Sequence, residues 1–371
     1  MPPGRRVTLK DVAKYAGVSV AAVSDIANRN RANLYTSETR EKVVAAMNTL
    51  GYVAERAAQN LRTGRSGTVG FVLTRRFSNP FFARVADLVD QALATHDLEM
   101  QLILVSGRVE RAGELARRLI GSGVDGVIAG PLYPWDRTLV GQLGVIESSP
   151  LPVVVFGNLE QSAFRNTVLL ADMHAGQVAI DYLVGLGHTR IGLFGATPAD
   201  KAIGKTFSNQ DGMERALDRR DLLRHASSWF IPIPDEASGQ DHVQEAVRFA
   251  RRWLATGPDN RPTAIACRND QCAFALLAAL AECGVSVPEE LSVLGYDNTA
   301  EGEFVFPPLT SVDPRIDICI AEVVQRLLAL LASGGLQTDA PSPESEECRS
   351  ETELATDVPA VVERRSTLPS S

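Results

Sequence analysis

The sequence predicts a small all-α head followed by a much larger α/β body. Within residues 1–54, apolar side chains recur with the spacing of three short amphipathic helices. From Thr68 onward, short apolar runs alternate with helical stretches, a pattern typical of parallel sheets covered by helices on both faces. The head is basic, although the chain as a whole is acidic with a net charge of -8. These observations predict a three-helix, DNA-reading unit attached to an α/β domain.

The first helix of the head is predicted from its cap, its apolar stripe and its stop signal. Thr8 and Asp11 have the spacing of a capping box, with Asp in place of the more usual Glu. Gly17 follows the stripe and can adopt the left-handed conformation that a tight turn requires. The apolar face between them consists of Leu9, Val12, Ala13 and Ala16.

Two further helices complete the predicted head. Ser19 can cap the second helix, and the third begins near Thr36 or Ser37. Gly51 is placed to end the third helix. The predicted buried positions are Val23, Ile26 and Ala27 in the second helix, and Val43, Ala46, Met47 and Leu50 in the third.

The charge of the chain is concentrated in two opposite blocks. Eleven basic and five acidic side chains precede Thr68, which gives the head a net charge of +6 and leaves -14 for the rest. A basic head can neutralise phosphates, whereas an acidic body would be repelled by them. Three short helices could also form a purely structural bundle. The turn glycine, the small exposed residues of the second helix and the basic flanks favour DNA binding.

The body is predicted from apolar runs of strand length separated by helical stretches. In parallel sheets of this kind, ligands bind at the carboxyl ends of the strands or between lobes. Representative helices are Phe82–His96, Ala175–Gly185 and Gln271–Cys283. The predicted strands are Val69–Val72, Leu102–Val105, Gly126–Ile128, Pro152–Phe156, Arg190–Phe194, Thr263–Ala266 and Leu291–Gly295.

The sequence lacks the signals that are typical of several other classes of protein. The five cysteines show no C-x-x-C and no zinc-ligand spacing, so we expect free thiols in a reducing compartment. No apolar run is long enough to span a bilayer, and no signal-peptide core follows Met1. We therefore expect a cytoplasmic protein, associated with the nucleoid when bound to DNA. There is no P-loop, G-x-S-x-G or G-x-G-x-x-G, and we expect no enzyme activity, catalytic residue, cofactor or metal.

The first seventy residues resemble the DNA-binding head of the LacI/GalR (lactose-repressor) family of bacterial transcription regulators. The matching segments are TLKDVAKYAGVS at 8–19, VS at 23–24, TREKV at 39–43, LGY at 50–52 and LRTGRSGTVG at 61–70. The resemblance implies that the second helix reads the major groove. It also implies a hinge helix at 56–61 that folds on operator DNA and inserts Leu61 into the minor groove. The implied DNA-binding residues are Thr8, Ser19, Val20, Ala21, Ser24, Asp25, Asn28, Arg29, Arg31, Ala57, Ala58, Asn60 and Leu61.

The implied reading face departs from the family at Asp25, where a long polar or basic side chain is common. A carboxylate can only accept hydrogen bonds, most naturally from a cytosine amino group. Val20 and Ala21 can touch thymine methyl groups but make no side-chain hydrogen bonds. Alternatively, Asp25 is an exposed carboxylate that repels phosphate or pairs with Arg29. We expect few direct hydrogen bonds to bases, so that the hinge and the deformability of the DNA carry more of the specificity.

The resemblance continues through the body, which implies two Rossmann-like lobes like those of periplasmic sugar-binding proteins. The matching segments are SNPFF at 78–82, LGHTRIG at 186–192, ND at 269–270, GYDN at 295–298, PPLTSVD at 307–313 and VPAVVERRST at 358–367. The acidic, Ser- and Pro-rich stretch at 334–357 is expected to be a flexible insertion. The implied divisions are head 1–54, hinge helix and linker 55–67, and effector-binding and dimerisation domain 68–371, with lobe 1 near 68–158 plus 298–313 and lobe 2 near 159–297 plus 314–371.

By family position, six residues are implied to contact an effector between the lobes. Amides and carboxylates there would hydrogen-bond hydroxyl groups, and Phe81 would offer a flat apolar wall. Asn79 could instead only cap the helix that opens at Pro80, and Asp172 and Asp297 could only cap turns. The implied effector-binding residues are Asn79, Phe81, Asp172, Asn209, Asn269 and Asp297.

The implied pocket lacks an arginine that the family usually places three residues before a glycine. The glycine is Gly212, so Asn209 occupies the arginine position. An amide cannot make the bidentate contact that a guanidinium makes with a carboxylate or diol. Lys201, Lys205 and Arg215 are the nearby cations that could replace it.

The resemblance implies a homodimeric regulator, most naturally a repressor, that binds a near-palindromic, double-stranded operator. A small polar metabolite, a sugar or a related compound, would control DNA affinity by closing the lobes. The alternative is the same DNA-binding regulator with a degenerate pocket, controlled by a protein partner or by abundance. A transport-type solute-binding protein would need a signal peptide and no DNA-binding head. No membrane partner is expected.

Overall fold

The chain divides into two compact units, residues 1–67 and 68–371. The predicted hinge contacts Ala57, Ala58, Asn60 and Leu61, the loop residues Asn28, Arg29 and Arg31, and the insertion at 334–357 lie outside the described residues. The computed structural model describes residues 7–27, 34–52, 65–105, 108–133, 136–146, 149–158, 164–196, 208–233, 239–333 and 359–370.

The head is a three-helix unit, as predicted. Its helices are α1 (Leu9–Ala16), α2 (Val20–Ala27) and α3 (Ser37–Leu50). Gly17 and Gly51 end α1 and α3 with φ angles of 68° and 64°, the left-handed conformation expected of them. At the start of α1, the Asp11 carboxylate accepts hydrogen bonds from the backbone and hydroxyl of Thr8 at 2.9 and 2.7 Å. The predicted apolar stripes meet in one small core around Val12, Val23 and Val43.

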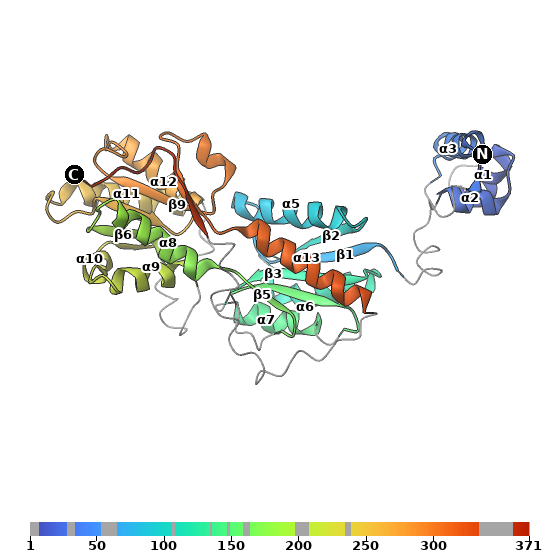
Figure 1. Ribbon diagram of the computed structural model, residues 1–371, viewed down its shortest axis with the longest axis horizontal. Coiled ribbons are helices and arrows are strands. Elements are labelled where there is room, and N and C mark those ends of the chain that lie inside the picture. Colours follow the sequence, from blue (N-terminus) through green and yellow to red (C-terminus); the bar gives the residue numbers. More distant parts are fainter. Residues whose placement is uncertain are drawn as a thin grey trace. The chain divides into compact units, whose positions relative to one another are not determined.

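Lobe 1 of the body is a parallel sheet with strand order β2-β1-β3-β4-β5 in the described chain. Its elements are β1 (Thr68–Leu73), α5 (Pro80–Ala94), β2 (Glu99–Leu104), α6 (Ala112–Gly121), β3 (Gly126–Leu132), α7 (Arg137–Leu143), β4 (Val153–Gly157), β5 (Thr167–Leu169) and α13 (Ile316–Ala332), with 3-10 turns at Val109–Arg111 and Gly144–Ile146. Helices α5 and α13 cover one face, and α6 and α7 cover the other (Figure 1). Neighbouring strand residues therefore enter different cores, Phe71 on the α5 side and Val72 on the α6 side.

Lobe 2 is a second sheet, with strand order β11-β10-β9-β8-β6-β7. All of its pairings are parallel except that of β11 with β10. Its elements are α8 (Asp172–Gly185), β6 (Ile191–Ala196), α9 (Asn209–Asp218), α10 (Leu223–Ser227), β7 (Phe230–Pro232), α11 (Gly239–Ala255), β8 (Ala264–Cys267), α12 (Asp270–Glu282), β9 (Ser292–Tyr296), a 3-10 turn at Ala300–Glu303, β10 (Thr310–Asp313) and β11 (Ala360–Val362). Helices α11 and α12 cover one face of this sheet, and α8 to α10 cover the other (Figure 1).

The structure corrects the expected allocation of segments to the lobes. Residues 298–313 belong to lobe 2, because β10 pairs with β9 and Val312 enters the lobe 2 core. Helix α13 belongs to lobe 1, because Ile316, Ile320 and Val323 pack in the core beneath α5. Strand β5 extends lobe 1 beyond residue 158, since it pairs with β4. The chain therefore crosses between lobes before α8, between β10 and α13, and again before β11.

The segment after β11 is bound along the edge of lobe 2 by side-chain hydrogen bonds. The Ser366 hydroxyl donates to the carbonyl of Val293 at 2.6 Å and accepts from the backbone N–H of Thr310 at 2.8 Å. His188, from the LGHTRIG segment, places Nε2 2.9 Å from the carbonyl of Leu368. This histidine is thus part of a structural clasp. None of the described helices is long and apolar enough to cross a membrane.

Candidate functional site

Polar side chains from both lobes gather just beyond the carboxyl ends of the parallel strands. Arg75, Tyr133 and Asn158 follow β1, β3 and β4 of lobe 1, while Tyr296 and Asp297 lie at the end of β9 in lobe 2. This is the edge at which open α/β sheets bind ligands. The connection between the lobes runs past the same edge, so the candidate site lies between them.

Asp172, the first residue of α8, joins groups from the two lobes. Its carboxylate accepts a hydrogen bond from Asn158 Nδ2 at 2.6 Å and from the Tyr296 hydroxyl at 2.7 Å. Burial raises the pKa of Asp172 from 3.8 to about 6, and the two hydrogen bonds oppose that rise. The predicted site residue is therefore buried and bound to side chains of both lobes.

Tyr133 brings a phenol of lobe 1 close to the carboxylates of lobe 2. Burial raises its pKa well above the ordinary value; Asp172 and Asp297 raise it further, whereas Arg75 lowers it. Arg75 forms an ion pair with Asp136 at 2.6 Å, and its guanidinium lies 4.9 Å from the centre of the Tyr133 ring. The backbone N–H of Tyr133 also donates to Asp136 at 2.8 Å. This arrangement fixes a hydroxyl group at the lobe junction.

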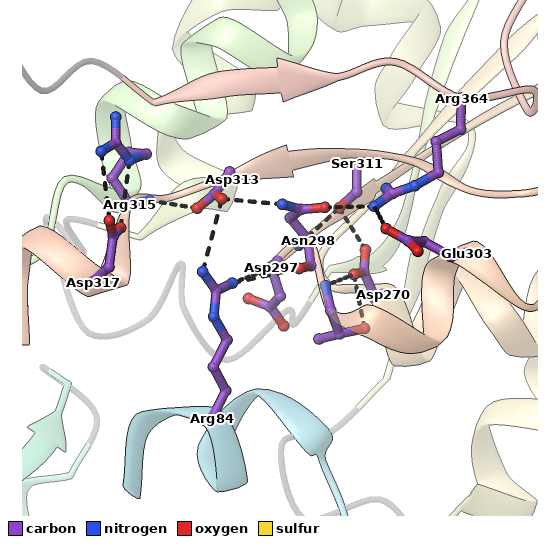
Figure 2. A network of polar contacts seen from close by, with 11 residues as sticks. Arg84, Asp270, Asp297, Asn298, Glu303, Ser311, Asp313, Arg315, Asp317 and Arg364 are labelled. Atoms are coloured by element: carbon purple, nitrogen blue, oxygen red, sulfur yellow. Dashed lines mark hydrogen bonds and ion pairs between the residues drawn. The ribbon is translucent and has the colours of Figure 1, made fainter. Parts of the chain in front are cut away.

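Asp297 supplies a buried acceptor. Its side chain is only 5% exposed, and its φ of 111° is unusual for a residue other than glycine. Burial raises its pKa well above the ordinary value, and Asp270 and Asp172 raise it further against the opposing charges of Arg84 and Arg268. Among the residues drawn in Figure 2, no hydrogen bond reaches the Asp297 carboxylate.

The backbone of Asp297 is contacted from the other lobe. Arg84, on α5 of lobe 1, donates from Nη1 to the carbonyls of Asp297 and Asn298 at 3.3 and 3.4 Å. Its Nη2 lies 3.9 Å from the Asp313 carboxylate (Figure 2). Arg84 therefore ties lobe 1 to the β9–β10 region of lobe 2, next to the candidate ligand acceptor.

Asp270, in contrast, has a structural role. Its carboxylate accepts from the Ser311 hydroxyl at 2.6 Å and from the backbone and hydroxyl of Thr299 at 2.7 and 3.1 Å. Burial raises its pKa from 3.8 to about 6 against these hydrogen bonds. Both carboxylate oxygens are engaged, so Asp270 fastens α12 to β10 rather than facing a ligand.

Three of the other predicted effector residues have local structural contacts. The side-chain oxygen of Asn79 accepts from the Phe81 backbone at 3.0 Å, and that of Asn269 accepts from the Cys272 backbone at 2.9 Å. Each therefore caps a helix, which for Asn79 was the expected alternative. Phe81 is 5% exposed in the lobe 1 core and packs edge-on against Phe82, so it does not form an open wall.

Asn209 stands where the family places an arginine, and only one of the three cations expected to replace it, Arg215, lies among the described residues. Arg215 is exposed on α9, and Lys201 and Lys205 lie outside the described residues. Asn209 is 8% exposed and donates from Nδ2 to the backbone carbonyl of Arg268 at 2.6 Å. Among the described residues, Arg75 lowers the pKa of Tyr133, and Arg84 and Arg268 lower that of Asp297, in each case against the larger effect of burial.

The glycine of the same motif has a clear packing role. A Cβ at Gly212 would lie 1.9 Å from the carbonyl oxygen of Met173, and a Cβ at Gly176 would lie 1.9 Å from that of Asn209. The backbones of α8 and α9 therefore meet at two reciprocal points. This contact fixes the spacing between Asp172 and Asn209, the first residues of the two helices.

Sequence reasoning missed Tyr133, Arg75 and Asp136. The available signal was position, because Tyr133 directly follows β3 and Arg75 lies two residues after β1.

Hydrogen-bond donors and carboxylates dominate this site, which suits hydroxyl or amino groups of a small polar molecule. Within the described ranges, no group of three or more His, Cys, Asp or Glu residues could hold a metal ion.

The head presents α2 as its candidate reading surface. Ser19 caps this helix by accepting from the backbone of Ala22 at 3.1 Å. Val20 is 42% exposed and Ala21 is also exposed. Asp25 lies one turn after Ala21 and accepts a hydrogen bond from the Tyr35 hydroxyl at 2.9 Å. Asp25 therefore has a partner within the head, which was not among the expected alternatives.

Comparisons with known proteins agree with this two-part organisation. Residues 8–55 match the family of bacterial regulatory proteins of the lacI type, and residues 180–367 match the periplasmic binding protein-like domain. The HTH-type transcriptional repressor PurR of Vibrio cholerae is 30% identical over 305 residues, which cover 82% of this chain and 85% of that protein. PurR of Photobacterium profundum is 29% identical over 305 residues, with coverage of 82% and 86%.

Solved structures extend the likeness over nearly the whole chain. The lac repressor dimer bound to operator and an anti-inducer superposes with a TM-score of 0.69 at 23% identity, covering 98% of this chain and all of that one, and supports the fold. A complex of the transcriptional regulator CelR with cellobiose has a TM-score of 0.61 at 25% identity, covering 97% of this chain and 100% of that one. The chain therefore belongs to the LacI family of bacterial regulatory proteins and is a DNA-binding transcriptional repressor.

Proposed function

We propose that a small polar metabolite, a sugar or a related compound, binds between the two lobes and controls the affinity of this repressor for its operator. The observation that carries this proposal is the buried Asp297 carboxylate, which lies within electrostatic range of the lobe 1 phenol of Tyr133. A ligand that donates hydrogen bonds to Asp297 and contacts Tyr133 would bind the closed lobes better than separated ones. Such differential binding is what shifts a conformational equilibrium.

Relatives support the chemical class. The CelR structure holds cellobiose, and a LacI-type regulator from Enterococcus faecium holds ribose. Carboxylates and amides suit hydroxyl groups, and the Asn158 and Tyr296 hydrogen bonds orient Asp172 at the same site. The absence of an arginine at position 209 favours neutral polyols over acids, because the amide of Asn209 is already bound to a backbone carbonyl.

We also propose that the repressor acts as a homodimer on a near-palindromic operator. The lac repressor neighbour is described as a dimer bound to operator. In this chain, Phe304 and Phe306 are 84% and 82% exposed on lobe 2, which is costly for a surface that always faces water. A second copy of the chain is the proposed occupant of this surface. At the hinge, Leu61 of each protomer would wedge into the minor groove, as the resemblance implies.

The deciding experiment is a thermal-shift screen of the full-length protein against sugars, sugar acids, polyols and nucleosides. Saturation at about 100 times Kd adds about 2.7 kcal/mol to the stability of the liganded state, which raises Tm by several degrees. Each hit is then tested for its effect on binding to an operator obtained by selection from random DNA. A hit that shifts both quantities supports the proposal.

The variant Asp297→Asn is expected to weaken such a hit by at least tenfold, because an acceptor oxygen of the carboxyl group is replaced by an amide NH2 group, which can only donate. The matched control is Asp259→Asn, which changes an exposed carboxyl of the same lobe. If no compound in any class shifts Tm and DNA affinity together, the alternative regulator with a degenerate pocket is favoured.

A further inference from the structure

The hydrogen bond between Tyr35 and Asp25 joins the reading helix to the segment that precedes α3. The Tyr35 hydroxyl lies 2.9 Å from Asp25 Oδ2, and both side chains are half-buried. The Tyr35 ring packs against the head core, and the next residue, Thr36, caps α3 by accepting from the Thr39 backbone at 3.3 Å. The phenol is therefore anchored on both sides, and its hydroxyl is a fixed donor.

A carboxylate held in this way can form a hydrogen bond with only some of the bases. Within the described part of the head, Oδ2 of Asp25 accepts from the phenol, so Oδ1 is the oxygen that a contact with a base would use. In the major groove, guanine presents two acceptors, and thymine an acceptor and a methyl group, so neither suits a carboxylate. Adenine offers an amino group beside the N7 acceptor, which would repel the second oxygen. Cytosine offers its amino group without a neighbouring acceptor.

We propose that Tyr35 is a specificity-determining positioning residue, which holds Asp25 so that its remaining oxygen accepts a hydrogen bond from one cytosine amino group in each operator half-site. This inference rests on the proposed use of α2 for reading the major groove. Val20 and Ala21 on the same helix add only apolar contacts. The cytosine contact would therefore provide most of the polar base contacts made by the face of α2 that carries Val20 and Ala21.

Prior positioning matters because Asp25 is an anion close to DNA phosphates. A carboxylate free to rotate would lose conformational entropy on binding and could turn away from the base. The hydrogen bond from the phenol restricts that rotation. The expected effect of removing the hydroxyl is a loss of discrimination at one base pair, not a general loss of DNA affinity.

The test compares the full-length protein with Tyr35→Phe and Asp25→Asn by selection from random DNA, followed by affinity measurements on single-base variants of the selected site. The wild type is expected to select cytosine at one position of each half-site. Tyr35→Phe keeps the ring in the core and should lose about fivefold discrimination at that position, the effect of one hydrogen bond. Asp25→Asn should move the preference at that position towards adenine, which an amide can read.

The matched control is Tyr52→Phe, which alters a second tyrosine packed against the same core and should leave the selected site unchanged. If Tyr35→Phe retains full discrimination at every position, the inference is overturned. It is also overturned if Asp25→Asn lowers the Tm of the head without changing base preference, because the pair would then be only a structural tie. If the wild type selects no motif, the proposed operator binding itself is contradicted. That outcome is distinguishable from a failure of the Tyr35 inference, because it does not involve the variants.

Discussion

At the scale of single residues, Asp172 links the candidate site to the stability of the body. Its pKa is raised from 3.8 to about 6 by burial. In the pH window between these two values, the folded state therefore holds a proton that the unfolded chain has lost. The free energy of unfolding therefore falls as pH rises across that window, and the unfavourable contribution is fully present above it. For one carboxyl, a shift of about two units corresponds to roughly 3 kcal/mol.

We predict that Asp172→Asn removes much of this pH dependence, because the amide does not titrate. The measurement is urea unfolding of the body followed at several pH values between about 4 and 7. Asp270 has the same raised pKa and should account for a remaining slope. The exposed control Asp259→Asn should reproduce the wild-type slope. An unchanged slope in Asp172→Asn would show that burial does not hold a proton on this carboxyl.

At the scale of secondary-structure elements, Arg84 connects α5 to the β9–β10 region. We predict that Arg84→Gln weakens effector binding by about three- to tenfold, because loss of the tie lowers the population of closed lobes. It should also increase the radius of gyration of the unliganded body in X-ray scattering. Arg248→Gln, which breaks an exposed ion pair within α11, should do neither. Equal effects of both variants would contradict a specific role of Arg84.

The contact between α8 and α9 leads to a prediction about packing. Gly212→Ala would place a methyl group 1.9 Å from a backbone oxygen, so the two helices must separate. We expect a loss of at least about 3 kcal/mol in stability and a weaker effector site, measured by urea unfolding and ligand titration. The matched control is Gly141→Ala in α7, where nothing lies within 4 Å of the added carbon. That substitution should be neutral or stabilising.

The sequence predicted the individual elements well and their partners less well. Periodicity and caps are local signals, so the helices after Thr8, Ser19 and Thr36 and the strands β1 to β4, β6, β8 and β9 follow from nearby residues. The short strands β5, β7 and β10 were not predicted. The partner of α13 does not, because its apolar stripe would fit either sheet and the choice depends on contacts far away in the chain. The same limit explains Tyr133, whose role depends on carboxylates from another lobe, and Phe81, whose apolar ring the core of lobe 1 buries.

At the scale of the whole molecule, the exposed aromatic surface on lobe 2, formed by Phe304 and Phe306, is the proposed dimer interface. We predict that replacing Phe304 and Phe306 together by serine converts the dimer to a monomer, measured by light scattering after gel filtration. Operator affinity should fall by orders of magnitude, because two half-sites are then no longer bound together. Leu254→Ser, at a half-exposed leucine of α11, is the control and should remain dimeric. A double variant that stays dimeric would place the interface elsewhere.

The order of segments in the body has a further consequence. Helix α13 belongs to lobe 1, yet the chain returns afterwards to complete lobe 2 with β11 and the segment around Ser366. That final segment is retained by ladder hydrogen bonds, by Ser366 and by His188, none of which depends on the covalent connection between α13 and β11. A cleavage in that connection would therefore yield two fragments that remain associated. The final strand is in effect a peptide that the body binds, and a synthetic copy could reconstitute a truncated repressor.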